Sequence, residues 1–512
     1  MIVAGDQPVE NPSPAIGSKP AIKLFSFLDD GTQVPTTITG DSTSGYQLGP
    51  FATHTSPDKM VYLVLSGQHG ADAAYDYGTH FLFVAHEWPS IGFGGNGNPA
   101  SAGIRGTIMR VNLDADFAHR VTIVADRDAD GNALPGFDGI TWDPFRKKLL
   151  ASPEERSPNG GVWSFNADGS DPRNEGAYFG ASSYEGMQIA PDGSMIIAED
   201  DGGGKGVANP NAKAPMDYVY RWVPNDRSFL AGGGRLEALQ VLADDGTPIA
   251  PRGATRSNGA NNDPVITDAG LRSLHSYGRT FAARWVTCQV VPAGGMPAPY
   301  DANTACYNAF ATPFRRPENA VYRPGTHFQE IWFSDTGDTD RRSEENANGG
   351  YGSIFRFVMT DSAAGTGSFN LVFLGDQNHS GFDNVAWWDK DHVVFEEDAG
   401  NTLHTQTGHF DSMWMFDANA DYGVTGNKPL RLLAAGRDPI AALSQTLGKY
   451  GLSDDENELT GITVSDGDPS PDGLLGAKSP HPFHGGWHVF YTLQHGQGNL
   501  YEVEPNPWAQ GS

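Results

Sequence analysis

The sequence predicts an all-β fold, and three observations lead to this prediction. The 512 residues include 64 Gly, 35 Pro and 11 % aromatic residues, a composition that suits many short strands joined by turns better than a helical or a disordered chain. Short apolar segments recur in a fixed order along the chain. Several of them alternate large apolar with polar side chains, which is the period of a half-buried strand. No helical periodicity separates the segments, so a parallel α/β architecture is disfavoured.

The first strand of the repeat starts with an acidic and a small residue, continues with a short apolar run and ends in a turn. Its copies are FDGITWDP from Phe137, YEGMQIAPDG from Tyr184, PENAVYRPG from Pro317, FDNVAWWDKD from Phe382 and ELTGITVSDG from Glu458.

The second strand is apolar and stops in an acid or a histidine. Its copies are THFLFVAHE, KKLLASPEE, SMIIAEDD, EIWFSD, HVVFEED and HVFYTLQH. A third strand, in which large apolar and polar residues alternate, follows each time, as in GTIMRVNLD and GSIFRFVMTD. Fourth strands are plausible in RVTIVADRD, LEALQVLAD, FNLVFLGD and LRLLAAGRD. Six copies of a four-stranded unit predict a six-bladed β-propeller.

The last copy has no obvious fourth strand, so we expect AIKLFSFLDDG, from Ala21, to complete it and close the ring. This divides the chain into an N-terminal extension, residues 1–20, and a single propeller domain, residues 21–512. The stretch 227–314 is longer than a blade connection needs, and it is either an insertion or a degenerate seventh blade.

The acids of the repeat are expected to meet at one mouth of the central channel. The start of the first strand lies beside the end of the second in an antiparallel hairpin, and the innermost strands surround the channel. Carboxylates gathered in this way repel one another unless cations neutralise them, and oxygen ligands suit Ca²⁺, Mg²⁺ or Mn²⁺. Taken singly, each acid is as well explained as a turn residue or a strand-end cap. The recurrence of acids at equivalent positions is what predicts a metal site.

Two sets of candidate residues follow. The predicted metal ligands are Glu185, Glu199, His275, Glu318, Asp383, Glu396, Glu397 and Glu458. The predicted catalytic residues are Arg316, which can bind phosphate oxygens bidentately, and His495, which can ligate metal or protonate a leaving group. His86 is a further histidine candidate. Paired cations that activate water and neutralise phosphate oxygens indicate phosphoric ester hydrolysis.

Several of these segments together resemble the PhoX-type alkaline phosphatases. They are HEW at His86, APDGSMIIAEDD, DYVYRWV, RRPENAVYRPG from Arg315, DNVAWWD, ELTGITV and YTLQHGQG. The resemblance implies a six-bladed propeller, export to the periplasm, a multinuclear iron and calcium site and hydrolysis of phosphomonoesters. By resemblance, Glu199, Glu318 and Glu458 fall at the positions of ligand glutamates.

The sequence departs from this family at one ligand. The family has a cysteine iron ligand in a Cys-Ala-Gly-Gly run, whereas the corresponding stretch here, GASSYEGMQ, has no cysteine. Glu185 is a candidate replacement, and we expect two or more Mn²⁺ or Ca²⁺ ions, with Fe possible. Phosphotriesterase activity would also fit, and Trp88, Phe93, Trp387 and Trp388 would then supply apolar walls. The sequence is compatible as well with a calcium-dependent lactonase and with a non-catalytic binding propeller.

Charge and cysteine content limit partners and compartment. The net charge of −28 argues against nucleic acid as a partner and is compatible with cation binding. The expected partner is a small-molecule phosphate ester, the substrate. A disulfide between Cys288 and Cys306 would fit a periplasmic or secreted protein, although two free thiols remain possible and the chain shows no signal peptide. No apolar run approaches the roughly 20 residues that span a bilayer.

Overall fold

The computed structural model of the chain describes most residues from 56 onward and several short segments before them. The described residues are 1–3, 9–10, 12, 25–27, 33–38, 41–44, 47–48, 51–52, 56–88, 107–132, 134–156, 159–435, 458–474, 476–494 and 499–505.

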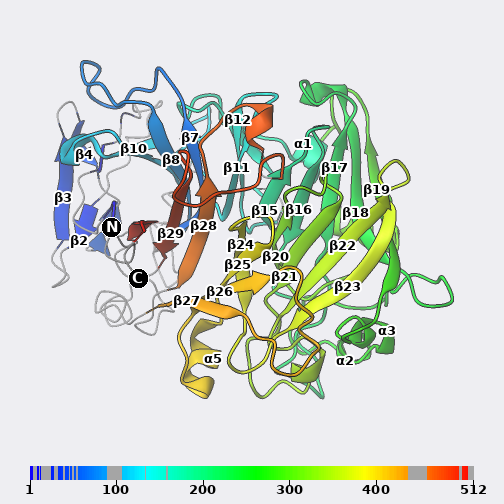
Figure 1. The fold of residues 1–512 in the computed structure, drawn as a ribbon. Helices are drawn as coiled ribbons and strands as arrows, with labels where there is room; N and C mark the ends of the chain where they lie inside the picture. Colours follow the sequence, from blue (N-terminus) through cyan, green and yellow to red (C-terminus); the bar gives the residue numbers. More distant parts are fainter. Residues whose placement is uncertain are drawn as a thin grey trace.

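The described part of the chain contains six blades of antiparallel strands (Figure 1). The first blade contains β7 (Ser56–Val64), β8 (His80–Trp88), β9 (Thr107–Asn112) and β10 (Val121–Ala125), and the second contains β11 (Gly139–Asp143), β12 (Lys148–Ser152), β13 (Trp163–Phe165) and β14 (Arg173–Asn174). The third contains β15 (Tyr184–Ile189), β16 (Met195–Glu199), β17 (Val219–Pro224) and β18 (Gly234–Val241), and the fourth contains β20 (Pro317–Tyr322), β21 (Glu330–Asp335), β22 (Ser353–Asp361) and β23 (Thr366–Leu374). The fifth contains β24 (Phe382–Trp387), β25 (His392–Glu397), β26 (Ser412–Asp417) and β27 (Leu430–Ala434), and the sixth contains β28 (Leu459–Ser465), β29 (His488–Leu493) and β30 (Leu500–Val503).

The innermost strands close into a ring. β7, β11, β15, β20, β24 and β28 contact one another in this order, and β28 contacts β7. The apolar cores lie between neighbouring blades; Trp332 of β21, for example, packs edge-on against Trp387 of β24, with ring centroids 5.5 Å apart. The predicted all-β propeller is confirmed, and its six first strands surround a central channel.

The predicted insertion joins the third and fourth blades instead of forming a seventh. β19 (Phe281–Val291) pairs antiparallel with both β18 and β23, so that the two blades form one nine-stranded sheet, and Figure 1 shows these long strands side by side. The insertion also holds the short helices α2 (Asp263–Ile266), α3 (Ala269–Ser273) and α4 (Ala302–Asn308). Cys288 of β19 and Cys306 of α4 form the disulfide. The first part of the predicted range, Gly234–Val241, is the blade strand β18.

Two features of the first and last blades bear on the prediction. The pattern missed β7, whose sequence SPDKMVYLV has a proline followed by an acid near its start, as PENAVY does. The prediction that AIKLFSFLDDG completes the last blade falls mostly outside the described residues. Its described part, β2 (Phe25–Phe27), pairs with β3 (Gln33–Ile38), and Val3 forms a bridge to Leu500 of β30.

The remaining elements are short. They are β1 (Val9–Glu10), which pairs parallel with β10, β4 (Asp41–Ser44), β5 (Gln47–Leu48), β6 (Phe51–Ala52), α1 (Gly176–Phe179) and α5 (Gly400–Thr407). Among the residues described, no helix has the length and apolar character needed to cross a bilayer.

Candidate metal centre

Five of the six innermost strands carry the same irregularity near their start. Two residues of the strand stand opposite one residue of the second strand, which is a β-bulge, at 58–59, 185–186, 318–319, 383–384 and 461–462. A bulge redirects the side chains of its residues and is common beside active sites. In four strands the first bulge residue is a buried acid, namely Asp58, Glu185, Glu318 or Asp383. The bulges therefore present carboxylates at one end of the channel.

The other two innermost strands place their acids differently. In β28 the first bulge residue is Gly461, whose φ is 71°, and a Cβ there would lie 2.5 Å from the backbone oxygen of Asp58. The acid of this blade, Glu458, therefore stands three residues earlier. β11 has no bulge, and Asp138 directly precedes it, with its N–H donating to the oxygen of Ser152 at 3.0 Å.

Eight carboxylates form one continuous cluster, which we call the acidic ring. Ligand oxygens of Glu185, Glu318 and Asp383 all lie within 4.8 Å of one another, and all three residues are buried. Three further groups with the same spacing share members with this one. The ring consists of Asp138, Glu154, Glu185, Asp200, Glu318, Asp383, Asp398 and Glu458. The structure thus brings four of the predicted ligands together: Glu185, Glu318, Asp383 and Glu458.

Amide side chains at the second bulge position link the carboxylates. Asn319 Nδ2 donates to Glu185 Oε1 (3.0 Å) and to Asp383 Oδ1 (3.3 Å). Asn384 Nδ2 donates to Asp383 Oδ1 (3.0 Å) and to Asp58 Oδ1 (3.3 Å). The Oδ1 atoms of both asparagines are buried and have no hydrogen-bond partner within the described part of the chain. Because unsatisfied buried acceptors are costly, these amide oxygens fit a site that a cation completes.

Burial and mutual repulsion shift the ring carboxyls toward the neutral form. Burial raises the pKa of Glu185 well above its usual value, and the charges of Glu318, Asp138 and Asp383 raise it further. Burial, together with the charge of Asp398, raises the pKa of Asp383 to about 7. Such groups stay ionised at neutral pH only if cations are near.

Arg316 lies at the edge of the acidic ring. Its Nε donates to Asp200 Oδ2 at 2.7 Å, and its Nη2 lies 3.4 Å from Glu318 Oε1. The hydroxyl of Thr336 also donates to Glu318 Oε1. Lys213 is a second cation here, and its pKa is lowered to about 8 by burial and by the charge of Arg316. The ring is therefore flanked by positive charge on the side of β16 and β20.

The preceding residue, Arg315, has a different role. Its side chain is buried, with Nη1 donating to the oxygen of Asn348 (3.3 Å) and Nε 3.4 Å from Asp338 Oδ1. Arg315 thus holds the loop after β21, and only Arg316 of the pair reaches the ring.

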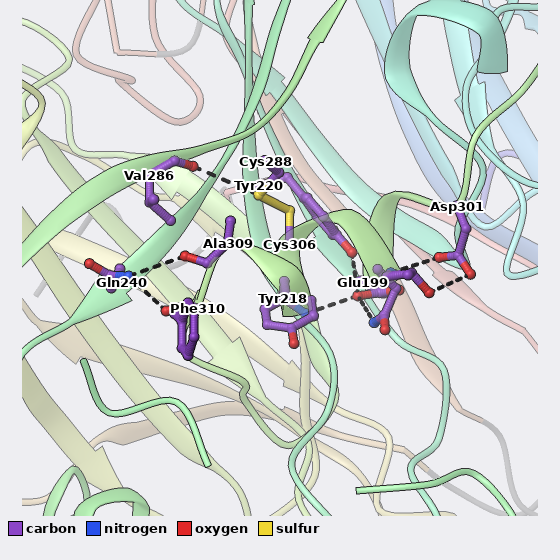
Figure 2. Close-up of a disulfide and its surroundings, with 12 residues drawn as sticks. Glu199, Tyr218, Tyr220, Gln240, Val286, Cys288, Asp301, Cys306, Ala309 and Phe310 are labelled. Atoms are coloured by element: carbon purple, nitrogen blue, oxygen red, sulfur yellow. Dashed lines mark hydrogen bonds between the residues drawn. A yellow bond between two sulfur atoms is a disulfide. The ribbon is translucent and has the colours of Figure 1, made fainter. Parts of the chain in front are cut away.

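Glu199 and Glu397 lie outside the acidic ring. Each is the last residue of a second strand and accepts at least one backbone N–H. Glu397 accepts from the nitrogens of Ser380 (2.7 Å) and Ser412 (2.9 Å). Glu199 Oε2 accepts from the nitrogen of Tyr218 (3.0 Å) and the hydroxyl of Tyr220 (2.6 Å), as Figure 2 shows beside the disulfide. These contacts are those of strand-end caps that tie the second strand to its neighbours.

Glu199 does belong to a second, separate acidic group. Ligand oxygens of Glu199, Asp201 and Asp217 lie within 4.8 Å of one another. Arg156 and Arg256 both pair with Asp201, and Arg256 Nη2 lies 3.7 Å from Glu199 Oε1. Arginines thus supply positive charge to this group.

Glu396 and His275 are placed away from the acidic ring as well. Glu396 stands opposite the bulge of β24, faces the next blade and accepts from the nitrogen of Ile462 at 2.8 Å. His275 follows α3, and its Nδ1 lies 3.0 Å from Ser353 Oγ. Burial and the charge of Arg315 lower the pKa of His275 to about 3.

Of the remaining candidates, three are described. His86 is buried at the end of β8, and Trp387 lies in an interblade core. Trp388 packs against Phe483. His495, Phe93 and the side chain of Trp88 lie outside the described residues.

Four members of the acidic ring are not among the predicted ligands. One is Asp138, the acid in the first-strand copy FDGITWDP, and the other three follow second strands. Asp200 and Asp398 directly follow the last residues of β16 and β25, and Glu154 stands two residues beyond the end of β12. The signal was present in the runs EDD, EED and PEE, but the pattern does not tell which acid of a run faces the channel. Because the strand β7 was not predicted, neither was Lys59, which lines the channel and follows Asp58 in this strand.

Comparison with known proteins identifies the family. The sequence model of alkaline phosphatase PhoX matches residues 195–468, which is more than half of the chain. The chain belongs to the PhoX family. This confirms the predicted resemblance, and the matched region includes Asp200, Glu318, Asp383, Asp398 and Glu458 of the acidic ring. No curated protein matches this PhoX chain.

Solved structures that resemble the PhoX chain are distant in sequence. A putative 6-phosphogluconolactonase from Bacteroides uniformis has 9 % identity and a TM-score of 0.32, with 83 % of this chain and 94 % of that chain covered. The WD40 β-propeller domain of Doa1 has 8 % identity and a TM-score of 0.31, with 90 % and 100 % covered.

PhoX membership supports a phosphatase that hydrolyses phosphoric esters and depends on metal, and the acidic ring is compatible with a metal site. The carboxylate and amide oxygens of the ring fit hard cations. A thiolate ligand is excluded, because both cysteines of the sequence are joined in the disulfide.

Proposed function

We propose that the protein is an exported, metal-dependent phosphomonoester hydrolase whose site is the acidic ring at one mouth of the propeller channel. The observation that carries the proposal is the pairing of the ring with fixed positive charge from Arg316 and Lys213 on one side. Two or more Ca²⁺ or Mn²⁺ ions would be held by Glu185, Glu318, Asp383 and their ring neighbours. When bound, such ions polarise phosphoryl oxygens and lower the pKa of water.

The residues of the chain add binding and orientation. Arg316 is positioned by Asp200 to contact phosphoryl oxygens, and a guanidinium matches their geometry with two parallel hydrogen bonds. Asn319 and Asn384 fix the carboxylates at defined positions, so that little rearrangement is needed on binding.

The charge of the site favours a monoester over a neutral triester. A phosphate monoester is a dianion near neutral pH and is attracted by the charges of Arg316 and Lys213, whereas a neutral triester has no net charge for them to attract. Trp387, one of the apolar walls expected for a triester site, is only 2 % exposed and lies in a core. The acidic ring with flanking cations is therefore better suited to a dianionic substrate.

The test compares esters and variants of the metal-loaded protein. We expect turnover of p-nitrophenyl phosphate and little turnover of a neutral aryl phosphotriester. Glu318→Gln is expected to lose most activity and part of the bound metal while the propeller stays folded. The control is Glu330→Gln at the other end of the β20–β21 hairpin, which should keep both.

Several outcomes would contradict the proposal. Full activity and full metal content in Glu318→Gln would remove Glu318 from the site. A preference for the triester would make the protein a phosphotriesterase. A single bound calcium ion without cleavage of either ester would redirect the search to lactones, and after that to a binding role.

A further inference from the structure

Lys59 occupies a position that other blades use to reach the acidic ring. It is the second residue of the bulge in β7, as Asn319 is in β20 and Asn384 is in β24. Both asparagines direct their amides onto the carboxylates at this mouth of the channel. The shared register therefore places an ammonium where two other blades present an amide.

The surroundings of Lys59 are acidic on the side of the ring and mostly apolar on the other. Lys59 lines the channel, where burial lowers the pKa of its ammonium while the nearby carboxylates of Glu185, Asp383, Asp58 and Asp138 act to raise it. Farther along the channel, the innermost strands contribute mainly apolar side chains. Among the described lining residues, Asp468 is the only other charged group, and it is paired with Lys478 at 2.7 Å.

Hydrogen bonds hold the carboxylates near Lys59 in place. Asp58 is held by Asn384 and by Gln494, whose Nε2 donates to Asp58 Oδ2 at 3.2 Å. Asp138 and Glu185 belong to one group of the acidic ring, together with Glu154. The strand β7 contacts β11, which Asp138 directly precedes, and β11 contacts β15, which carries Glu185. A cation at Lys59 therefore lies on the side of the ring that holds Asp138 and Glu185, and it repels a divalent ion there.

We propose that the Lys59 ammonium is a built-in cation of the acidic ring and takes the place of one divalent ion beside Asp138 and Glu185. Divalent ions then bind at the remaining groups of the ring, which are those of Glu154, Asp200 and Glu318, of Glu185, Glu318 and Asp383, and of Asp383, Asp398 and Glu458. This inference rests on the proposed metal-dependent function.

Metal stoichiometry in a charge-removing variant tests the inference. Lys59→Asn introduces the amide already present at Asn319 and Asn384, so the bulge should be retained. After equilibrium dialysis against Ca²⁺ or Mn²⁺ and elemental analysis, this variant is expected to hold one more ion per chain than the wild type. Lys59→Arg keeps the charge and should keep the wild-type count. The same change at an exposed lysine, Lys147→Asn in the β11–β12 turn, is the control.

The possible outcomes separate the two proposals. An unchanged count in Lys59→Asn, with metal bound and phosphatase activity present in the wild type, would overturn the role of Lys59 alone. If neither protein binds metal, both proposals fail. If Lys59→Asn does not fold, as judged by near-UV circular dichroism, Lys59→Met carries the same expectation and the same criterion.

Discussion

Arg316 shows how much of the site depends on a single residue. Its φ of 59° lies in the left-handed region, which a non-glycine side chain adopts at a cost, and such strain persists where surrounding contacts fix it. Here the contacts are those to Asp200 and Glu318. The backbone of Arg315 is held at the same point, because its N–H donates to Asp335 Oδ2 at 3.1 Å.

Arg316→Lys is expected to lower kcat/KM for p-nitrophenyl phosphate by about 100-fold, the scale found when one transition-state hydrogen-bond donor is lost. Lysine keeps the charge but cannot reproduce the two parallel hydrogen bonds of the guanidinium. Steady-state kinetics on the metal-loaded variant measure this. The control Arg323→Lys, at the far end of β20, should stay within a few fold of the wild type. Equal kinetics for both variants would show that the geometry of Arg316 is not used.

At the scale of the strand, the sequence predicted the hairpins but not which acid of each run faces the channel. The runs EDD and EED located the ends of β16 and β25 correctly. Which acid side chain faces the channel, however, depends on the bulge in the opposing strand, because the bulge shifts the register by one residue. A single sequence does not reveal such a bulge. Glu199 and Glu397 are consequently strand-end caps, whereas Asp200 and Asp398 belong to the acidic ring.

The insertion is the element in which the disulfide acts. The bridge joins β19 to α4, and Asn303 of α4 donates to Glu199 Oε2 (2.9 Å) and to the backbone oxygen of Met216 (2.9 Å). The disulfide thus anchors a helix that packs on the cap of β16, and Figure 2 shows the bridge and Glu199 in the same region.

Replacing both cysteines by serine is expected to destabilise the fold by about 3 kcal/mol, the chain-entropy value for a loop of this size. The bridged cysteines are 18 residues apart. Because neither sulfur is a ligand, the folded variant should keep the wild-type metal content. Denaturant unfolding and elemental analysis measure the two quantities. A folded variant that had lost metal would show that the insertion supports the acidic ring more directly than the contacts indicate.

At the scale of the whole molecule, the ring of six innermost strands explains why the fold was easier to predict than the site. Each blade repeats the same strands, so the repeat is visible even where one strand, β7, is missed. The acidic ring arises only when carboxylates from separate blades meet, and Asp138 and Glu458 are 320 residues apart in sequence.

The gathering of buried carboxylates from several blades also predicts how the stability of the protein depends on pH. In the metal-free protein, burial raises the pKa of Glu185 and Glu318 well above the usual value and that of Asp383 to about 7. The folded state therefore binds more protons than the unfolded state between the unfolded pKa values, near 4, and about 7 or above. Stability from these groups is complete below this window and is lost as the pH rises through it.

We therefore expect the metal-free protein to unfold at a lower temperature at pH 8 than at pH 5, and Ca²⁺ or Mn²⁺ to raise the unfolding temperature more at pH 8. Carboxyls with a lowered pKa, such as Asp340 with a pKa of about 2, make the protein more stable as the pH rises, but they do so below about pH 4 and so outside this pH range. Thermal unfolding with chelator and with metal at pH 5, 6, 7 and 8 measures both effects. Glu318→Gln, which removes one raised carboxyl, should flatten the pH dependence of the metal-free protein. A metal-free protein that becomes more stable toward pH 8 would mean that the ring carboxylates are neutralised within the chain itself, with Arg316, Lys213 and Lys59 supplying enough charge without added ions.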